Sequence, residues 1–493
     1  MRIPVDRQSH IPLYKQIKLH LQQGILSGSL VPDTRLPASR QLARDLGVNR
    51  NTVETAYSEL EADGLIFSRV GSGTYVATSL PLLPQPIESL DATWPLWQQN
   101  VQLGSLKPER LESDNIHSTV QHPNLISFAG GTSASRMFPA DDFRKVLQNI
   151  MRRDGIAALE YGESNGYAPL RATIAHVLAS QGLQARAENI LVTAGSQQAL
   201  SLVSQLLLTS GDTILVESPT YSGALELFRA LGFTVIGIPM DNNGMVVECL
   251  EKLLQQHHPK LIYTIPNFHN PTGTCLGSTR RHELIVLADR YNVPILEDDF
   301  VGDLRYEGRT QPSLKALDPG GRVIYTNTFS KMLMPGLRVG YLFVDGPVYE
   351  RLVNFKRVND LASSTLIQRA LEAYVTVGRY QAHLRRSCRE FHKRRDAMIA
   401  ALNRYLDDVE FDVPQGGLFL WVRLPGEITA DDLLQAASEE MVDFVPGSRF
   451  FPDDNQGNDW MRLNFVVHSP EKIDEGIKRL GTAIERLGTK NLE

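Results

Sequence analysis

Apolar side chains recur with a helical period at the start of the chain. Leu13, Ile17, Leu21 and Ile25 follow one another every four residues, so that one face of the segment 12–28 is apolar. Gly28 comes after the last of them, and glycine is the residue that most often ends a helix. The pattern predicts one amphipathic helix over this segment.

Two shorter helices and a pair of strands are predicted next. The run SRQLARDLG predicts a helix with Ser39 as its N-cap and Gly47 at its end, and Asn49 caps a third helix in NRNTVETAYSELEADG. Two helices joined by a tight glycine turn form a helix-turn-helix unit. The alternating run GLIFSRVGSGTYVA predicts a two-stranded wing with glycines at its tip.

Short apolar strands alternate with amphipathic helices from about residue 125 to the C-terminus. The strands are NILVTAG, DTILVE, KLIYTIP, VPILEDD and RVIYTNT, and the alternation predicts an α/β fold with a mostly parallel sheet covered by helices. Before it, four prolines between residues 81 and 95 predict an extended linker. The expected organisation is a winged helix-turn-helix domain at 1–77, a linker at 78–122 and a large domain at 123–493.

Composition narrows this picture only a little. At 493 residues the chain is too long for one ordinary core, and 42% apolar with 22% charged residues is typical of a soluble globular protein. It contains no run of eighteen apolar residues, no apolar stretch at the N-terminus that would suit a signal peptide, and three isolated cysteines outside metal-ligand spacing. We therefore expect a cytoplasmic protein with no membrane contact and no metal site.

Charge does not decide whether the first domain binds DNA. The whole chain carries a net charge of -6, whereas residues 1–77 hold nine basic and seven acidic side chains and so carry +2. This asymmetry is mild, and the pattern of side chains must decide.

The second helix of a helix-turn-helix enters the major groove with its N-terminal end. Here that end carries Arg50, Asn51 and Thr52, which can donate hydrogen bonds to base edges or phosphates. The wing offers Arg69 together with two small residues that allow close approach to a groove, Gly71 and Gly73. A helical hairpin with scattered arginines shares part of this pattern.

The run LPASRQLARDLGVNRNTVETAYSELEADGLIFSRVGSGTYV resembles the winged helix of the GntR-family transcription regulators over about seventy residues. Asn49 stands where that family usually has serine, and both residues cap helices well. The resemblance implies binding to double-stranded operator DNA. The contacts it implies fall on the wing glycines and on Arg35, Ser39, Arg40, Arg50 and Thr52.

A second set of chemical signals surrounds Lys331 in TFSKMLMPGLRVGY. A lysine amine reacts with the aldehyde of pyridoxal 5′-phosphate (PLP) to form an imine, and it must be held beside contacts to the phosphate and the ring. Ser330 and Arg338 flank Lys331 and suit a phosphate dianion. Taken alone, a lysine followed by an arginine is more often a solvated pair.

Other segments strengthen the hypothesis of a PLP site. Asp298 ends the apolar strand VPILEDD, where a carboxylate can pair with a pyridinium nitrogen. TAGSQQAL places Ser196 and Gln197 at the start of a helix, whose backbone amides can bind phosphate. Asn270 in HNPTG could bond the ring hydroxyl, and Tyr221 in ESPTYSGA could stack on the ring.

In this order the segments resemble fold-type-I aminotransferases over roughly residues 125–490, with a smaller C-terminal α+β subdomain. Joined to the GntR-type head, they resemble the MocR/GabR family of bacterial regulators. The resemblance implies that Lys331 binds PLP covalently, Asp298 pairs with the ring nitrogen, Asn270 meets the ring oxygen and Tyr221 stacks on the ring. It assigns the phosphate to Ser196, Gln197, Thr328, Ser330 and Arg338.

Two further assignments come from the resemblance alone. Tyr161 in EYGESNGYAPLR matches a tyrosine that reaches the phosphate of the neighbouring subunit in such dimers. Arg462 in MRLNF matches the arginine that binds a substrate α-carboxylate; the alternative is a surface arginine on an edge strand.

Phe300 departs from the pattern of these regulators, which usually carry tyrosine there as a donor to the ring oxygen. Without that donor we expect the pKa of the linkage between Lys331 and the cofactor to rise. Tyr306 or Tyr263 could supply the missing hydroxyl.

The leading hypothesis from the sequence is a PLP-dependent transcription regulator that senses PLP or an amino compound, as a head-to-tail homodimer. A catalytically active aminotransferase with a vestigial head is the alternative. An interaction module built on an inactive PLP fold is a third, weakened by the presence of the cofactor residues.

Overall fold

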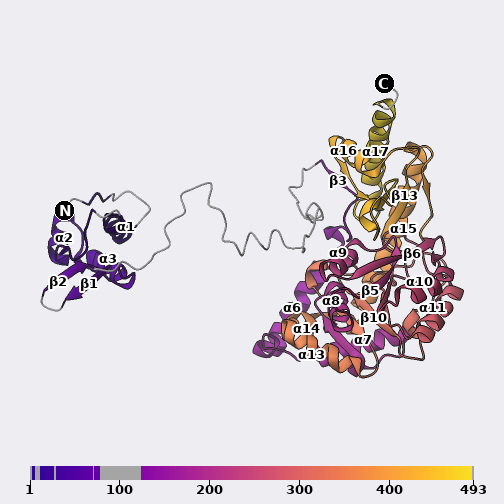
Figure 1. Ribbon diagram of the computed structural model, residues 1–493, viewed down its shortest axis with the longest axis horizontal. Helices are drawn as coiled ribbons and strands as arrows, with labels where there is room; N and C mark the ends of the chain where they lie inside the picture. The colour runs from indigo at the N-terminus through magenta and orange to yellow at the C-terminus, as the bar shows by residue number, and fades with distance from the viewer. Residues whose placement is uncertain (1–2, 6–11, 27–28, 70–71, 78–123, 491–493) are drawn as a thin grey trace. The chain divides into compact units, whose positions relative to one another are not determined.

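The computed structural model describes residues 3–5, 12–26, 29–69, 72–77 and 124–490. The chain divides into two compact units, Met1–Gln102 and Leu103–Glu493, and each is treated by itself (Figure 1). Gly28, Gly71 and the expected linker at 78–122 lie outside the described residues. No helix in the described ranges is long and apolar enough to span a membrane.

The first unit contains the expected three helices and strand pair. They are α1 (Leu13–Leu26), α2 (Ser39–Leu46), α3 (Arg50–Ala62), β1 (Ile66–Arg69) and β2 (Gly73–Val76). The two strands are antiparallel and pair Ile66 with Val76. The apolar faces of the three helices meet in one buried cluster that includes Ile17, Leu42 and Val53.

The helix ends in this unit follow local chemistry, with one correction. Gly47 ends α2 with a left-handed φ of 64°, and the Asn49 side chain accepts a hydrogen bond from the Asn51 backbone N–H at 2.9 Å. The prediction that Ser39 caps α2 is wrong. Ala38 occupies the N-cap position and Ser39 is the first helical residue, because its hydroxyl donates to Glu54 at 3.2 Å instead of capping the helix.

The second unit is built on a mixed, mostly parallel sheet of eight strands, which confirms the expected α/β fold. Their order across the sheet is β4-β11-β10-β9-β8-β5-β6-β7, and only β11 and β7 run antiparallel to their neighbours. The strands are β4 (Ile190–Thr193), β5 (Thr213–Ser218), β6 (Thr234–Asp241), β7 (Gly244–Met245), β8 (Leu261–Thr264), β9 (Ile295–Asp298), β10 (Val323–Thr328) and β11 (Gly340–Phe343).

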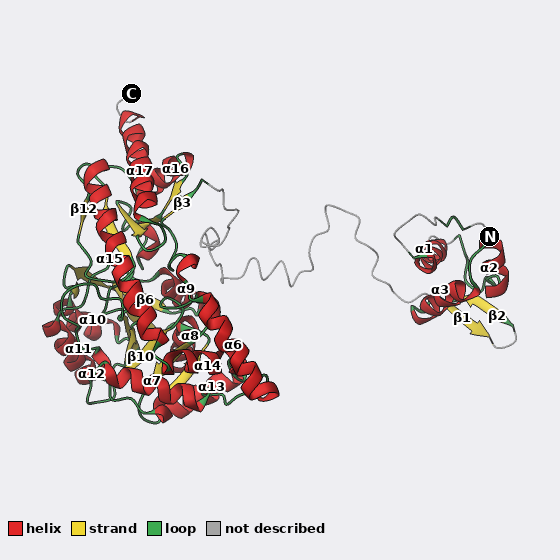
Figure 2. Ribbon diagram, turned by 180° about the vertical axis from the view of Figure 1, so that it is seen from behind, coloured by secondary structure: helices red, strands yellow, loops and turns green. Residues whose placement is uncertain are grey.

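Helices cover both faces of this sheet (Figure 2). Successive side chains of each buried strand point to opposite faces, and both faces are packed. On β8, Leu261 and Tyr263 belong to one buried cluster and Ile262 belongs to the other. The helices are α6 (Ala140–Asp154), α7 (Ala168–Ser180), α8 (Ser196–Leu207), α9 (Ser222–Ala230), α10 (Leu250–His257), α11 (Ser278–Tyr291), α12 (Leu314–Leu317), α13 (Val348–Asp360), α14 (Thr365–Thr376) and α15 (Arg379–Tyr405).

A smaller α+β part follows the long helix α15. Its antiparallel sheet has the order β12-β13-β16-β15, and a separate parallel pair joins β14 to β3 near the start of the unit. The elements are β3 (Ile126–Ser127), β12 (Glu410–Phe411), β13 (Phe419–Arg423), α16 (Ala430–Glu439), β14 (Val442–Asp443), β15 (Val445–Pro446), β16 (Trp460–Asn464) and α17 (Pro470–Lys490). This part brings Arg462 toward the large sheet.

Candidate functional site: a PLP site and a DNA-reading head

The candidate PLP site lies at the carboxyl edge of the parallel strands. Asp298 is the last residue of β9 and Thr328 the last of β10, and these neighbouring strands run parallel. Lys331 follows β10 by three residues, and α8 begins just after β4. Strand ends of a parallel sheet meet at one edge, where ligands of α/β proteins bind.

Asp298 is buried, with 3% of its surface exposed, and only one of its carboxylate oxygens has a partner. Oδ2 accepts a hydrogen bond from the Tyr263 hydroxyl at 3.1 Å, whereas Oδ1 has none among the described residues. Burial raises the pKa of Asp298 to about 7, although the hydrogen bond from Tyr263 opposes this rise. A buried carboxylate oxygen without a donor fits a ligand that brings its own N–H, as a pyridinium ring does.

The expected phosphate site gathers a hydroxyl, a guanidinium and a helix N-terminus. The buried Ser330 hydroxyl has no partner among the described residues. Arg338 Nη2 donates to the Ala194 carbonyl at 2.7 Å, and a Cβ at Gly195 would lie 2.8 Å from that nitrogen. Gly195 precedes α8 with a φ of 95°, so a side chain there would both strain the backbone and fill the space beside Arg338.

The side chains of Thr328 and Gln197 form hydrogen bonds with other groups of the protein. The Thr328 hydroxyl donates to the Val339 carbonyl at 3.2 Å and accepts from the Ser330 backbone N–H at 3.1 Å. Gln197 Nε2 donates to the Gly223 carbonyl at 2.9 Å and Gln197 Oε1 accepts from the Tyr221 hydroxyl at 3.5 Å. These hydrogen bonds connect the segments that line the site. Ser196 at the start of α8 adds a backbone amide.

Lys331 is the amine at the centre of this site. Burial, followed by the positive charges of Arg462 and Arg338, lowers its pKa to about 8, whereas Asp298 raises it. A Cβ at Gly131 would lie 3.3 Å from Lys331 Nζ. The glycine therefore leaves room beside the amine, and the lowered pKa favours the neutral form that attacks an aldehyde.

Arg462 lies inside the protein and not on its surface. It sits on β16, which pairs with both β13 and β15, and 5% of its surface is exposed; the alternative of an edge-strand surface arginine is therefore wrong. Its guanidinium donates to Asn270 Oδ1 at 2.9 Å and to the Ala129 carbonyl at 2.7 Å.

Two aromatic rings enclose the same guanidinium. It lies 4.2 Å from the ring centroid of Phe419 and 4.9 Å from that of Phe450. Burial lowers the pKa of Arg462 to about 9, and its Nε has no partner among the described residues. A buried cation with a spare donor is suited to a carboxylate ligand.

Tyr221 and Tyr161 have different surroundings. Tyr221 lies beyond the carboxyl end of β5 and directly precedes α9. Burial raises the pKa of its hydroxyl to about 12. Tyr161, in contrast, is 87% exposed, and the single chain does not bring it into the site.

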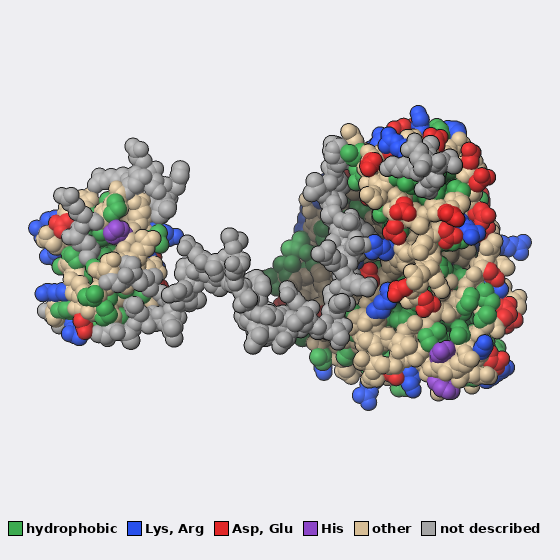
Figure 3. All heavy atoms as spheres, turned by 45° about the horizontal axis from the view of Figure 1, so that its top comes forward, with side chains coloured by type: hydrophobic (Ala, Val, Ile, Leu, Met, Phe, Trp, Pro, Cys, Tyr) green, Lys and Arg blue, Asp and Glu red, His purple; other side chains and the backbone are tan. Residues whose placement is uncertain are grey.

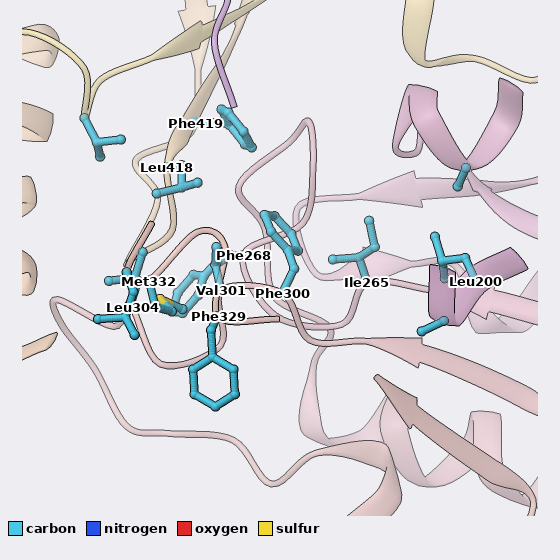
Figure 4. Packing of buried hydrophobic residues seen from close by; sticks show 14 of the residues in the cluster. Leu200, Ile265, Phe268, Phe300, Val301, Leu304, Phe329, Met332, Leu418 and Phe419 are labelled. Atoms are coloured by element: carbon cyan, nitrogen blue, oxygen red, sulfur yellow. The ribbon is translucent and has the colours of Figure 1, made fainter. Parts of the chain in front are cut away.

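Phe300 packs among apolar side chains that include Ile265, Phe268 and Phe329, as Figure 4 shows. Neither proposed replacement hydroxyl is free. Tyr263 donates to Asp298, and Tyr306 donates to the Gly417 carbonyl.

The candidate nucleic-acid interface lies on α2, α3 and the wing. Arg50, Asn51 and Thr52 form the first turn of α3, and Arg35 and Arg40 are exposed. The Arg50 guanidinium pairs with Glu54 at 2.6 Å, and the same carboxylate accepts from Ser39. Glu54 therefore fixes the direction of two expected DNA contacts in the free protein.

The wing shows why glycine is needed next to its tip. A Cβ at Gly73, where φ is 122°, would lie 2.9 Å from Arg35 Nε. Arg69 lies 5.1 Å from the ring of Phe67 and 5.2 Å from that of Tyr75.

The larger unit has acidic and basic side chains interspersed on the face that Figure 3 shows. That face therefore offers no uniform charge to a nucleic acid.

Some residues of the site were missed by sequence reasoning. Tyr263 was considered only as a donor to the ring oxygen, yet it holds Asp298. Glu217 and His269, both 1% exposed, lie 3.3 Å apart, and His269 is the first residue of HNPTG. A carboxylate at the end of the apolar strand DTILVE was the available signal for Glu217. No group of side chains in the described ranges forms a metal cluster.

Fold and site together define a winged helix-turn-helix joined to a fold-type-I PLP-dependent transferase domain. The sequence model of the bacterial regulatory proteins of the gntR family matches residues 13–76, and that of the class I and II aminotransferases matches residues 134–480. The second match covers more than half of the chain.

Similar proteins carry both domains. YdfD, an HTH-type transcriptional regulator of Bacillus subtilis, is 32% identical over 99% of this chain and 100% of its own length. The probable rhizopine catabolism regulatory protein MocR of Rhizobium meliloti is 32% identical over 97% of this chain and 95% of its own length.

A solved structure resembles the larger unit. LysN, the α-aminoadipate aminotransferase of Thermus thermophilus in complex with N-(5′-phosphopyridoxyl)-L-leucine, is 34% identical with a TM-score of 0.73. The match covers 80% of this chain and 99% of LysN. The chain therefore belongs to the MocR-type family of GntR transcription regulators, whose aminotransferase-like domain has PLP as its cofactor.

Proposed function

We propose that this regulator binds operator DNA through its first unit and senses PLP, or an amino compound that reacts with it, through its second. The observation that carries the proposal is that two buried atoms near Lys331, Asp298 Oδ1 and Ser330 Oγ, have no partner among the described residues. Most buried polar atoms in native proteins have partners, and PLP would supply one to each of these two: a ring N–H and a phosphate oxygen. A DNA-binding regulator works where the DNA is, so a bacterial cytoplasmic location is part of the proposal.

The residues of the site divide the work of holding the cofactor. When bound, PLP supplies an electrophilic aldehyde and an electron-accepting ring. Asp298 would hold the proton on the ring nitrogen, Asn270 would meet the ring oxygen and Tyr221 would cover the ring face. Arg338, Ser330, Thr328 and the amides at Ser196 and Gln197 would bind the phosphate, and Lys331 would bind the aldehyde carbon.

The effector we propose is PLP itself or an amine with an α-carboxylate. Arg462 would bind the carboxylate with its Nε, which has no partner among the described residues. Asn270 lies in the loop that follows β8 of the large sheet and Arg462 on β16 of the smaller one, so a ligand bound to Arg462 would act where the two parts meet. A ligand regulates only if it prefers one arrangement over the other.

A head-to-tail homodimer completes the proposal. Exposed apolar side chains gather on two nearby segments of the larger unit: Ile156, Leu159 and Tyr161 on the first, Val358 and Leu361 on the second. A Cβ at Gly162 would lie 2.7 Å from Thr365 Oγ1, so the segments adjoin. Such surfaces mark interfaces, and Tyr161 would reach the partner's phosphate from there.

The test is fluorescence anisotropy of the full-length protein on DNA from upstream of its own gene. We expect tight, salt-sensitive binding that changes with PLP, and loss of that change in Lys331→Ala. Arg50→Ala should weaken binding in both states and serves as the control for the head. Equal affinity for this DNA and for random DNA, with and without PLP, contradicts regulation at this operator.

A second function, amino-acid transamination, has two observations in its favour. Lys331, Asp298 and Asn270, the residues expected to contact the aldehyde and the ring, are present, and the larger unit is 36% identical to the 2-aminoadipate transaminase of Thermus thermophilus. Sustained turnover of an amino acid and a keto acid, without specific DNA binding, would favour the enzyme. A single half-reaction is compatible with a sensor.

A further inference from the structure

A turn of two residues, Ala194 and Gly195, connects β4 to α8 and carries the phosphate site. Arg338 Nη2 donates to the Ala194 carbonyl at 2.7 Å. On the other side of the same residue, the Ala194 backbone N–H donates to Gln198 Oε1 at 2.7 Å. Ala194 is therefore held from both sides by side chains.

Gln198 is itself held by a partly buried ion pair. Its Nε2 donates to Asp360 Oδ2 at 2.9 Å, and Asp360 Oδ1 accepts from Lys356 Nζ at 2.9 Å. The Lys356 side chain is fully buried and Asp360 is the last residue of α13. An unbroken chain of hydrogen bonds therefore runs from α13 through Gln198 and Ala194 to Arg338.

This chain of hydrogen bonds positions the groups that would bind phosphate. The first N–H groups of α8 have no intrahelical acceptor and point out of the helix. Gly195 is packed closely, since a Cβ at Gly340 would lie 2.9 Å from its Cα and a Cβ on Gly195 itself would lie 2.8 Å from Arg338 Nη2. A movement of Ala194 would shift both the helix N-terminus and the guanidinium at once.

We propose that Gln198 and Asp360 are positioning residues for the cofactor's phosphate, and that they give the site its preference for PLP over pyridoxal, which lacks the phosphate. Gln198 keeps the Ala194 turn in place, and the carboxylate of Asp360 keeps the Gln198 amide oriented with its oxygen toward Ala194. This inference rests on the proposed cofactor site and adds to it two residues that do not touch the cofactor.

The test compares the dissociation constants for PLP and pyridoxal, measured by absorbance titration of the full-length protein freed of cofactor. In Gln198→Glu the glutamate faces the carboxylate of Asp360 and has lost the donor that bonded it, so the preference for PLP should fall about tenfold. Gln198→Leu, which removes both hydrogen bonds without adding charge, should reduce it in the same direction.

A second substitution provides a rescue. In the double variant Gln198→Glu, Asp360→Asn, the new amide donates to the new carboxylate while its oxygen still accepts from Lys356. We expect the preference for PLP to return to within about threefold of the wild-type value. A residue that served only to stabilise the fold would change both dissociation constants together and leave their ratio unchanged.

Gln205→Leu is the matched control, because Gln205 lies exposed on the same helix and its side chain bonds Ser201, which belongs to neither the phosphate site nor the Ala194 turn. The ratio of its dissociation constants for pyridoxal and PLP should equal that of the wild type. If the wild type itself binds PLP no better than pyridoxal, the proposed phosphate site is wrong. If the wild type prefers PLP and both Gln198 variants keep that preference, the site stands and the positioning role is overturned.

Discussion

The pKa of Lys331 makes a quantitative prediction about how the protein captures its cofactor. Burial and the charges of Arg462 and Arg338 lower this pKa from 10.5 to about 8. Near pH 7 about one amine in ten is then neutral, against about one in 3,000 for an ordinary lysine. Since only the neutral amine attacks the aldehyde, Lys331 should present about 300 times more reactive amine at pH 7 than its ordinary pKa allows.

The assay is the rate of PLP incorporation into the cofactor-free protein, followed by stopped-flow absorbance across a range of pH. The rate should rise with pH and level off above about pH 8, because the amine is by then mostly neutral. PLP has titratable groups of its own, so the same profile is recorded for a simple lysine derivative, whose rate should keep rising to about pH 10. Lys331→Ala reports any reaction at other lysines.

Arg462→Met tests the cause of the low pKa. Removing the nearby positive charge should raise the pKa of Lys331, so that the levelling-off moves to higher pH. The shift is partial, because burial remains the larger cause. A rate that keeps rising to about pH 10 in the wild type, as for an exposed lysine, refutes the reasoning. If Arg462→Met leaves the pH profile unchanged, the charge of Arg462 does not contribute to the low pKa of Lys331.

Three other substitutions test the interior of the larger unit. Burial raises the pKa of Asp298 to about 7, so between about pH 4 and about pH 7 the unfolded chain ionises this carboxyl while the folded apo-protein keeps it protonated, and stability is lost as pH rises. Asp298→Asn should therefore raise the melting temperature of the apo-protein more above about pH 7 than below about pH 4, while weakening PLP binding; equal melting shifts at both pH values would contradict this. Tyr263→Phe removes a donor to Asp298 and should raise the pKa of Asp298 further, seen as a higher midpoint in the pH dependence of PLP affinity. Arg281 is fully buried and donates to three backbone carbonyls and Asn267. Arg281→Met should therefore lower the free energy of unfolding by about 3–5 kcal/mol in urea titrations, whereas Arg290→Met, at an exposed position, should lower it by less than about 1 kcal/mol.

Periodic apolar patterns carried most of the fold prediction. The strands read from NILVTAG, DTILVE, KLIYTIP, VPILEDD and RVIYTNT are β4, β5, β8, β9 and β10. Buried parallel strands are short continuous apolar runs, and their alternation with helices leaves few possible topologies. Lys331 and Asp298 could be placed at one edge for the same reason, since Asp298 ends one parallel strand and Lys331 closely follows the end of another.

Contacts between distant segments were beyond such reasoning. Gln198 and Asp360 are 162 residues apart, and Tyr263 and Asp298 are 35 apart. Local propensity says nothing about which side chains meet across the sheet, and a polar residue within an apolar strand is equally consistent with several partners. The N-cap at Ser39 failed for the same reason, because Glu54 from the next helix competes for its hydroxyl.

Arg462 shows how much such contacts change a functional argument. From sequence it was an isolated arginine with two interpretations, whereas its burial between Phe419 and Phe450 leaves only an interior role. It bonds Asn270, from the loop that follows β8, and a backbone carbonyl, while its Nε has no partner among the described residues. A charged acceptor that bonds this nitrogen would stabilise the arrangement in which Arg462 stays bonded to Asn270. A sensor needs such differential binding, and a neutral amine without a carboxylate does not supply it at this position.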